Sequence, residues 1–296
     1  MLTDVSIREG GQQDVDLRHA VTDTKLDFMS LAVGSGVRRI ELTAFAPGPW
    51  FSDAEALVRG AAPRLPDAVS LRVLYFNTEG LADLMKHPRI MREGLFLTAA
   101  TAKYREKNYG QKSIAHAEVK MKRLITAFKK HGLRFDTLVM STAWGACDEV
   151  SMQESTLNYL GRLLAYAEDL GFPVHSVTLA DTMGCAAPEA IGELIQQVKK
   201  RWPGILTRAH LHPGPGTDEE CILAALEAGV EHWEASWCGL GGSPMADRAG
   251  GNLDIRQLIG VYNRLRLVHG FDEEAVLRMF HFLKKHTRRD IPNISF

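Results

Sequence analysis

The sequence predicts a (β/α)8 barrel, and three observations lead to that fold. Short runs rich in β-branched and apolar residues recur about eight times, spaced by roughly 25 to 45 residues. Segments with helical periodicity separate these runs, and several of the segments end in glycine. The chain has 296 residues, a length that a single α/β barrel commonly fills.

The predicted strands come first in this argument. In chain order they cover residues 5–9, 38–42, 70–76, 95–100, 137–142, 175–181, 207–212 and 232–236. Their near-continuous apolar character is typical of parallel strands buried on both faces. Eight such units in roughly 250 residues favour a closed barrel over a doubly wound sheet, which remains the alternative.

The predicted helices lie between and after these strands. They cover residues 52–65, 113–132, 153–171, 187–202, 217–230, 254–270 and 271–286. The last two follow the eighth strand and are expected to close or flank the barrel. No low-complexity linker or charge block divides the chain, so we expect one catalytic barrel domain over residues 1–296, with extra C-terminal helices from about residue 253.

Composition excludes several classes of function. The 35 Lys and Arg residues balance 36 Asp and Glu residues, which argues against a nucleic-acid binder or a membrane-surface protein. The N-terminus lacks the basic and apolar regions of a signal peptide, and no stretch approaches the 18 or so apolar residues of a membrane span. The four cysteines are scattered without a CxxC pair, which favours a reducing, cytoplasmic compartment over a disulfide framework.

Polar side chains gather where the predicted strands end. They are Arg8 and Glu9, Glu41 and Thr43, Asp181 and Thr182, and His210 and His212. Since the C-terminal ends of barrel strands carry the chemistry in this architecture, we expect these side chains to converge on one mouth.

His210 and His212 are the strongest sign of a metal. A two-residue spacing on a strand points both imidazoles to one face, as metal ligation requires, although a hydrogen-bonded pair is the alternative. Glu9 strengthens the case, because a buried carboxylate is costly without a cation or partner. Arg8 with Glu9 could equally be a structural ion pair, and Glu41 could pair with a barrel arginine.

A glycine-rich stretch follows the eighth predicted strand. Residues 237–252, WCGLGGSPMADRAGGN, hold five glycines. Such a density indicates either a mobile lid or a backbone that closely approaches a ligand, and a turn-rich connector is the alternative.

Five motifs resemble those of a known family. VSIREGGQQ, IELTAFAPGPW, LADTMGCAAP, RAHLHPGPG and GLGGSPMADRAGGN follow the order and approximate spacing of the DRE-TIM metallolyases, also called HMGL-like or pyruvate carboxyltransferase-like proteins. This family includes 3-hydroxy-3-methylglutaryl-CoA (HMG-CoA) lyase and isopropylmalate synthase. The wording of the second and fifth motifs is most similar to the HMG-CoA lyase branch, and the resemblance covers nearly the whole chain. It implies a (β/α)8 barrel that binds a divalent cation, Mg²⁺ or Mn²⁺.

The resemblance also implies roles for individual residues. The metal ligands would be Glu9, His210, His212 and Asn252. The catalytic residues would be Arg8, which steadies the enolate oxygen, together with Glu41, Asp181 and Ser243. Substrate would contact Arg8, Gln12, Thr43 and Thr182. The glycines after Glu9 would let the chain leave the site without crowding the cation.

Two positions depart from the family pattern. Glu9 replaces the family's metal-binding aspartate, so ligation must accommodate one more methylene. Ser243 stands where HMG-CoA lyases carry the loop cysteine that protonates the product, and an alcohol is a far weaker acid than a thiol of pKa about 8.5.

Three functions remain in view. The leading expectation is a metal-dependent carbon–carbon lyase that cleaves a 3-hydroxyacyl-CoA into an acyl-CoA and an oxo acid, with an acyl-CoA or hydroxy acid as its small-molecule partner and a homodimer as its assembly. An aldol or Claisen synthase of the isopropylmalate or homocitrate type, or an oxo-acid aldolase, is the second. A barrel that has lost turnover and acts as a binding protein is the third, and the replacements at Glu9 and Ser243 favour it.

Overall fold

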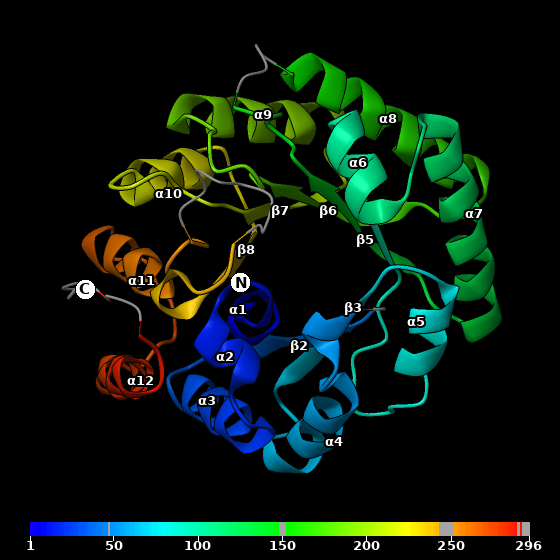
Figure 1. The fold of residues 1–296 in the computed structure, drawn as a ribbon. Helices are drawn as coiled ribbons and strands as arrows, with labels where there is room; N and C mark the ends of the chain where they lie inside the picture. The colour runs from blue at the N-terminus through cyan, green and yellow to red at the C-terminus, as the bar shows by residue number, and fades with distance from the viewer. Residues whose placement is uncertain (47, 148–151, 243–250, 289–290, 292–296) are drawn as a thin grey trace.

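The computed structural model describes residues 1–296 except 47, 148–151, 243–250, 289–290 and 292–296. Eight parallel strands form one sheet in the order β3-β2-β1-β8-β7-β6-β5-β4, and they curl into a nearly closed barrel within a ring of helices (Figure 1). The predicted (β/α)8 fold is confirmed. No helix in the described part of the chain is long and apolar enough to cross a membrane.

The strands match seven of the eight predicted runs closely. They are β1 Leu2–Asp4, β2 Arg39–Phe45, β3 Ser70–Tyr75, β4 Leu95–Ala99, β5 Phe135–Ser141, β6 Val174–Ala180, β7 Leu206–His210 and β8 His232–Ala235. Most of their residues are buried, which agrees with the near-continuous apolar runs in the sequence.

The helices include all seven that the periodicity predicts. The helices of the first half are α1 Ser6–Gln13, α2 Val15–His19, α3 Thr22–Gly34, α4 Ala54–Arg64, α5 Thr78–Leu84, α6 Ala102–Tyr109 and α7 Ile114–His131. Those of the second half are α8 Gln153–Asp169, α9 Pro188–Arg201, α10 Asp218–Glu227, α11 Ile255–Arg264 and α12 Glu273–His286. Two 3-10 turns, Pro49–Phe51 and Trp237–Gly239, complete the described elements.

The prediction for the first strand is wrong. Residues 5–9 are not a strand, because β1 ends at Asp4 and α1 begins at Ser6. The Asp4 carboxylate accepts hydrogen bonds from the Ser6 backbone N–H (2.9 Å) and hydroxyl (2.5 Å), and this local pairing turns the chain into the helix. The expected role of Gly10, to let the chain leave the site, is also wrong, because Gly10 lies within α1. A Cβ at Gly10 would lie 2.7 Å from Leu17 Cδ1, so the small residue lets α1 pack against α2.

The prediction for the cysteines is wrong for one pair. Cys147, after β5, and Cys185, after β6, form a disulfide, whereas Cys221 and Cys238 are buried and form no disulfide. Because β5 and β6 are neighbours in the sheet, the loops at their ends meet, although 38 residues separate the two cysteines in the sequence.

Candidate metal and active site

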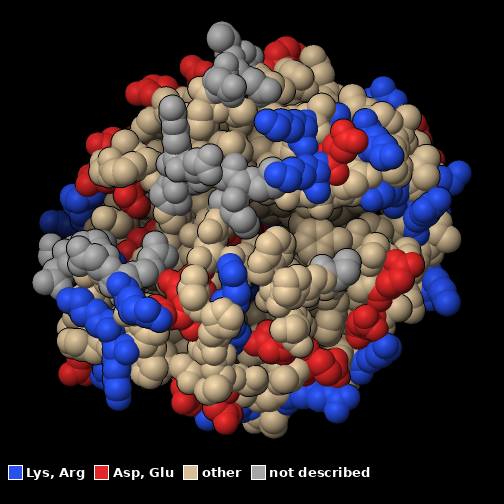
Figure 2. Space-filling model, in the orientation of Figure 1, with Lys and Arg blue, Asp and Glu red and all other residues tan. Residues whose placement is uncertain are grey.

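A cavity of about 580 Å³ opens at the C-terminal ends of the strands. Its lining includes Arg8, Glu9, Gln12, Glu41, Arg72, Thr182, His210, His212 and Glu234 on the polar side, and Leu74, Phe76, Leu97, Tyr109 and Val139 on the apolar side. Figure 2 shows a hollow on this face, with Lys and Arg side chains beside it over α6. The site therefore combines a charged floor with apolar walls.

Arg8 and Glu9 lie in the first turn of α1 and not at the end of a strand, which corrects their predicted placement. Arg8 Nη1 lies 2.5 Å from Glu9 Oε1, and Arg8 Nε donates to Glu41 Oε1 at 2.5 Å. Glu41 lies within β2 and also does not end its strand. Arg8 therefore forms the ion pairs that we considered as an alternative. Arg8, Glu9 and Glu41 also line the cavity, as the predicted convergence on one mouth requires.

Glu9, His210 and His212 form a cluster that could hold a metal ion. Their ligand atoms lie within 4.8 Å of one another, and all three residues are buried. The two imidazole Nε2 atoms are 3.1 Å apart, and His210 Nε2 is 3.6 Å from Glu9 Oε1. His210 ends β7 and His212 follows it by two residues, so the predicted convergence of the imidazoles on one face is observed.

Asn252 offers a fourth candidate ligand atom beside this cluster. Its side-chain Nδ2 donates to Glu9 Oε2 (3.2 Å) and to the Leu240 carbonyl (2.6 Å). Its Oδ1 is buried and has no hydrogen-bond partner among the described residues, a costly state for a protein oxygen unless a ligand binds it. The following Leu253 donates its backbone N–H to the Leu211 carbonyl (2.9 Å), which pins Asn252 beside the histidines.

The donor set fits a divalent cation. One carboxylate, one amide oxygen and two imidazoles form a mixed oxygen and nitrogen site of the kind that Mg²⁺, Mn²⁺ and related ions occupy. The longer side chain of Glu9 is accommodated because α1, and not a strand end, carries it to the histidines.

The protonation states of two of the three residues suit metal ligation. Burial raises the pKa of Glu9, but Arg8 and the two histidines outweigh it and hold that pKa at about 2. Burial and the neighbouring His210 lower the pKa of His212 to about 3. For His210, burial lowers the pKa, but Glu9 and Glu234 outweigh it and the net pKa is raised. Glu9 is thus ionised and His212 neutral at pH 7, as metal ligands must be.

The other predicted residues divide into three groups. Gln12 and Thr182 line the cavity, and the Thr182 hydroxyl accepts the Thr142 backbone N–H at 2.9 Å. Thr43 is buried but is not among the described residues that line the cavity. Ser243 lies outside the described residues, and so does half of the predicted lid, residues 243–250.

Asp181 follows β6 and is buried beside the site, but unlike its neighbour Thr182 it is not among the described residues that line the cavity. Its carboxylate accepts the backbone N–H groups of Cys185 and Ala186, each at 3.3 Å. Burial raises its pKa to about 6, against the lowering effect of those hydrogen bonds and of His210. Its own backbone N–H donates to the His210 carbonyl at 2.9 Å.

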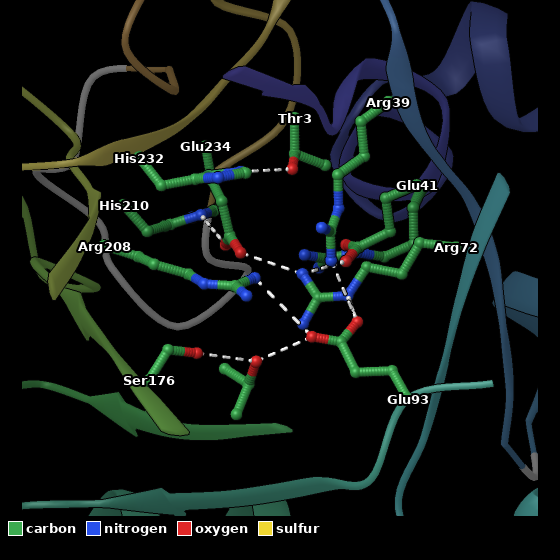
Figure 3. Close-up of polar contacts among 12 residues, drawn as sticks. Thr3, Arg39, Glu41, Arg72, Glu93, Ser176, Arg208, His210, His232 and Glu234 are labelled. Carbon is green, nitrogen blue, oxygen red and sulfur yellow. Dashed lines mark hydrogen bonds and ion pairs between the residues drawn. The ribbon is translucent and has the colours of Figure 1, made fainter. Parts of the chain in front are cut away.

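Sequence reasoning missed two charged residues of the floor, Arg72 on β3 and Glu234 on β8. Arg72 Nη1 lies 2.8 Å from Glu234 Oε1 and 3.2 Å from Glu41 Oε2, and Glu234 Oε2 lies 3.1 Å from His210 Nδ1 (Figure 3). The available signal was a single charge inside each buried run, in SLRVLYF and HWEAS, because a buried charge needs a partner.

Comparisons with known proteins agree with this geometry. The HMGL-like family model matches residues 1–282. The (R)-citramalyl-CoA lyase of Chloroflexus aurantiacus is 24% identical over 98% of this chain and 92% of that protein, and the cytoplasmic HMG-CoA lyase of Danio rerio is 27% identical over 97% and 83%.

Solved structures show the same fold. The HMG-CoA lyase of Bacillus subtilis has a TM-score of 0.84 at 21% identity, over 99% of this chain and 95% of that one. An HMG-CoA lyase from Acinetobacter baumannii, in complex with coenzyme A and 3-methylmalate, has a TM-score of 0.81 at 22% identity, over 100% and 97%. The two curated relatives named above are carbon–carbon lyases, and the family model spans nearly the whole chain, so this chain belongs to the HMGL-like family.

Proposed function

We propose that this protein is a divalent-metal-dependent carbon–carbon lyase that cleaves a 3-hydroxyacyl-CoA into an acyl-CoA and an oxo acid. The observation that carries the proposal is the buried cluster of Glu9, His210 and His212, which lies on the floor of the cavity beside Arg8. With HMG-CoA as the substrate, the products are acetyl-CoA and acetoacetate.

Glu9, His210, His212 and the Oδ1 atom of Asn252 would hold the cation, for which Mg²⁺ or Mn²⁺ is the choice that fits the donors. When bound, the cation acidifies the substrate hydroxyl and orients the neighbouring carboxylate or carbonyl oxygen. The contacts of Asn252 Nδ2 with Glu9 Oε2 and the Leu240 carbonyl hold the amide beside Glu9.

Bond cleavage needs a base and an electron sink. We assign the base to Asp181, which is buried, donates its backbone N–H to the His210 carbonyl (2.9 Å) and has a pKa of about 6, suited to proton acceptance at neutral pH. Loss of the hydroxyl proton turns the carbinol carbon into the ketone of the oxo acid. The electrons of the breaking carbon–carbon bond pass into the thioester as an enolate.

Arg8 faces the enolate in this proposal. Arg8 lines the cavity. Its Nη1 contacts Glu9 and its Nε contacts Glu41, which fixes the guanidinium without using all five of its N–H donors. A positive charge held in place before the reaction stabilises the developing oxyanion. The enolate carbon then takes a proton to give the acyl-CoA, and Ser243 remains our predicted donor.

The cavity suits a coenzyme A thioester. Lys107 and Lys120 line it, and their positive charges are available to a phosphate-bearing substrate. Trp50, Phe76 and Tyr104 give it an aromatic wall. The curated relatives named above act on CoA thioesters, and one structural neighbour binds coenzyme A with a methyl-substituted hydroxy diacid, which supports the same substrate class here.

The assembly and the compartment are also proposals. We propose a homodimer, the state that the family resemblance implies, and a cytoplasmic location. The cytoplasmic HMG-CoA lyase of Danio rerio supports this location, whereas the mitochondrial enzyme of Arabidopsis thaliana is also a relative, at 25% identity.

A substrate panel tests the proposed function. Purified protein, stripped with a chelator and reloaded with Mg²⁺ or Mn²⁺, is incubated with HMG-CoA and with citramalyl-CoA, and acyl-CoA and oxo-acid products are followed by mass spectrometry. Equal amounts of the two products from either thioester support the lyase. Metal binding without cleavage of either would direct the search to other hydroxyacyl-CoA substrates and to the condensation direction.

A further inference from the structure

A closed circuit of five buried side chains and the partly buried Arg8 joins the candidate metal ligands to the charge that faces the enolate. We call it the floor ring, and its members in order are Glu9, Arg8, Glu41, Arg72, Glu234 and His210. Carboxylates alternate with basic groups around it, and successive distances are 2.5, 2.5, 3.2, 2.8, 3.1 and, closing from His210 to Glu9, 3.6 Å.

Glu234 has a distinct position in the floor ring. It uses one carboxylate oxygen, Oε1, for Arg72 and the other, Oε2, for His210 Nδ1. A carboxylate can only accept a hydrogen bond from Nδ1, so Nδ1 carries a proton and Nε2 is turned toward Glu9 and His212.

Arg72 holds Glu234 in that position. Its side chain is 2% exposed and lies between three carboxylates, with Nη1 at 2.8 Å from Glu234 and 3.2 Å from Glu41, and Nε at 2.9 Å from Glu93 (Figure 3). Contacts on three sides leave the guanidinium little freedom, and Glu234 is fixed in turn.

We infer that Glu234, fixed by Arg72, is the positioning residue that presents His210 Nε2 to the cation. Through Arg72 and Glu41, the same contacts connect His210 to Arg8. This inference rests on the metal site of the proposed function. A carboxylate behind a ligating imidazole fixes its orientation and raises its basicity, and loss of such a partner typically lowers metal affinity about 10- to 100-fold.

The chain offers a matched control in Glu93. Glu93 and Glu234 are both buried and both contact Arg72, at 2.9 and 2.8 Å. Glu93 pairs on its other side with Arg39 and Arg208 and accepts from Thr137, and no described contact joins it to a metal-ligand candidate. A glutamine at either position keeps the volume and removes one charge next to Arg72.

The test compares Mn²⁺ binding by wild type, Glu234→Gln and Glu93→Gln, measured by isothermal titration of the chelator-stripped full chain. Glu234→Gln replaces one of the two accepting oxygens by an NH2 donor, so the side chain cannot keep both the Arg72 and the His210 contacts in the same geometry, and the Mn²⁺ affinity of this variant should fall at least about 10-fold. Glu93→Gln should lower the melting temperature but leave Mn²⁺ affinity unchanged. Equal affinities in wild type and Glu234→Gln, or equal losses in both variants, would overturn the positioning role.

A second measurement needs no variant to fold. In metal-free wild type with ¹⁵N-labelled histidine, long-range ¹H–¹⁵N spectra report which ring nitrogen is protonated, and His210 should show a protonated Nδ1. A His210 ring protonated only on Nε2 would overturn the inference. If the wild type binds no Mn²⁺, the metal site itself is overturned. If the wild type binds Mn²⁺ and Glu234→Gln binds it with the same affinity, only the positioning role is overturned.

Discussion

The Nε2 atoms of His210 and His212 lie 3.1 Å apart and are buried together. Two bare imidazole nitrogens at this distance turn lone pairs toward each other, so a proton or a cation must lie between them. The low pKa of His212, about 3, keeps that imidazole neutral at pH 7, and with the ionised Glu9 beside it the pair can accept a divalent cation.

This arrangement predicts that Mn²⁺ stabilises the folded protein through His212. At a free concentration of about 100 times Kd, a ligand that binds only the native state adds about 2.7 kcal/mol to the free energy of unfolding. Thermal melts of stripped wild type with and without Mn²⁺ should show the shift, and His212→Ala should lose it. A variant that still responds as wild type does would exclude His212 as a ligand.

Gly241 predicts a second effect on the metal site. Its φ is +92°, and a Cβ there would lie 2.4 Å from Glu9 Cβ and 2.5 Å from Asn252 Nδ2. Gly241→Ala should therefore displace two candidate ligands. It should reduce the free energy of Mn²⁺ binding by more than it reduces the free energy of unfolding of the metal-free protein. Gly204→Ala, where a Cβ would meet nothing within 4 Å, is the control, and normal Mn²⁺ affinity in Gly241→Ala would contradict the site geometry.

Replacement of Arg8 is expected to lower kcat. Replacement of Arg8 by Met keeps an unbranched side chain but removes the charge that faces the enolate, and loss of such a donor costs about 10²- to 10³-fold in kcat. Steady-state kinetics should show the fall chiefly in kcat. Because Arg8 contacts Glu9, the Mn²⁺ affinity of the same variant is measured to show whether metal binding has changed. A kcat within a few fold of wild type would exclude Arg8 from the mechanism.

His232 predicts a pH dependence of stability. Burial and the nearby Arg208 lower its pKa to about 3, and its ring lies 2.7 Å from Thr3 Oγ1. Between pH 6.5 and 3 the unfolded chain binds a proton at this residue that the folded chain does not, so stability falls as pH falls below 6.5.

The size of this effect follows from the shift. From pH 7 to pH 5, His232 should cost about 2 kcal/mol of unfolding free energy, at about 1.36 kcal/mol per pH unit below the unfolded pKa. Urea melts of wild type and His232→Gln at both pH values measure it. The variant should lose about 2 kcal/mol less than wild type over this interval, and parallel losses would contradict the buried neutral state.

The strand pattern and the HxH pair were readable from the sequence because they are local. Alternation of apolar runs and helices located seven strands, and a two-residue spacing placed His210 and His212 together. The first strand failed because VSIRE has a β-rich composition, whereas the Asp4 carboxylate bonded to Ser6 starts a helix.

The contacts of the floor ring and the disulfide were beyond sequence reasoning for a different reason. Arg72 and Glu234 are 162 residues apart, and Cys147 and Cys185 are 38 apart, so only the closed sheet brings each pair together. A lone charge in a buried strand shows that a partner is needed, but not which one. Thr43 illustrates the converse: we expected it at the end of its strand, but β2 continues to Phe45 and a register shift separates Thr43 from Glu41, which does line the cavity.

The most direct test of the central claim is a coupled assay of chelator-stripped protein with HMG-CoA, with and without Mn²⁺, beside a His210→Ala control. The proposed lyase predicts acetoacetate and acetyl-CoA in equal amounts, only with metal and only from wild type. Product formation that is indifferent to metal, or that survives in His210→Ala, would contradict a mechanism built on this site.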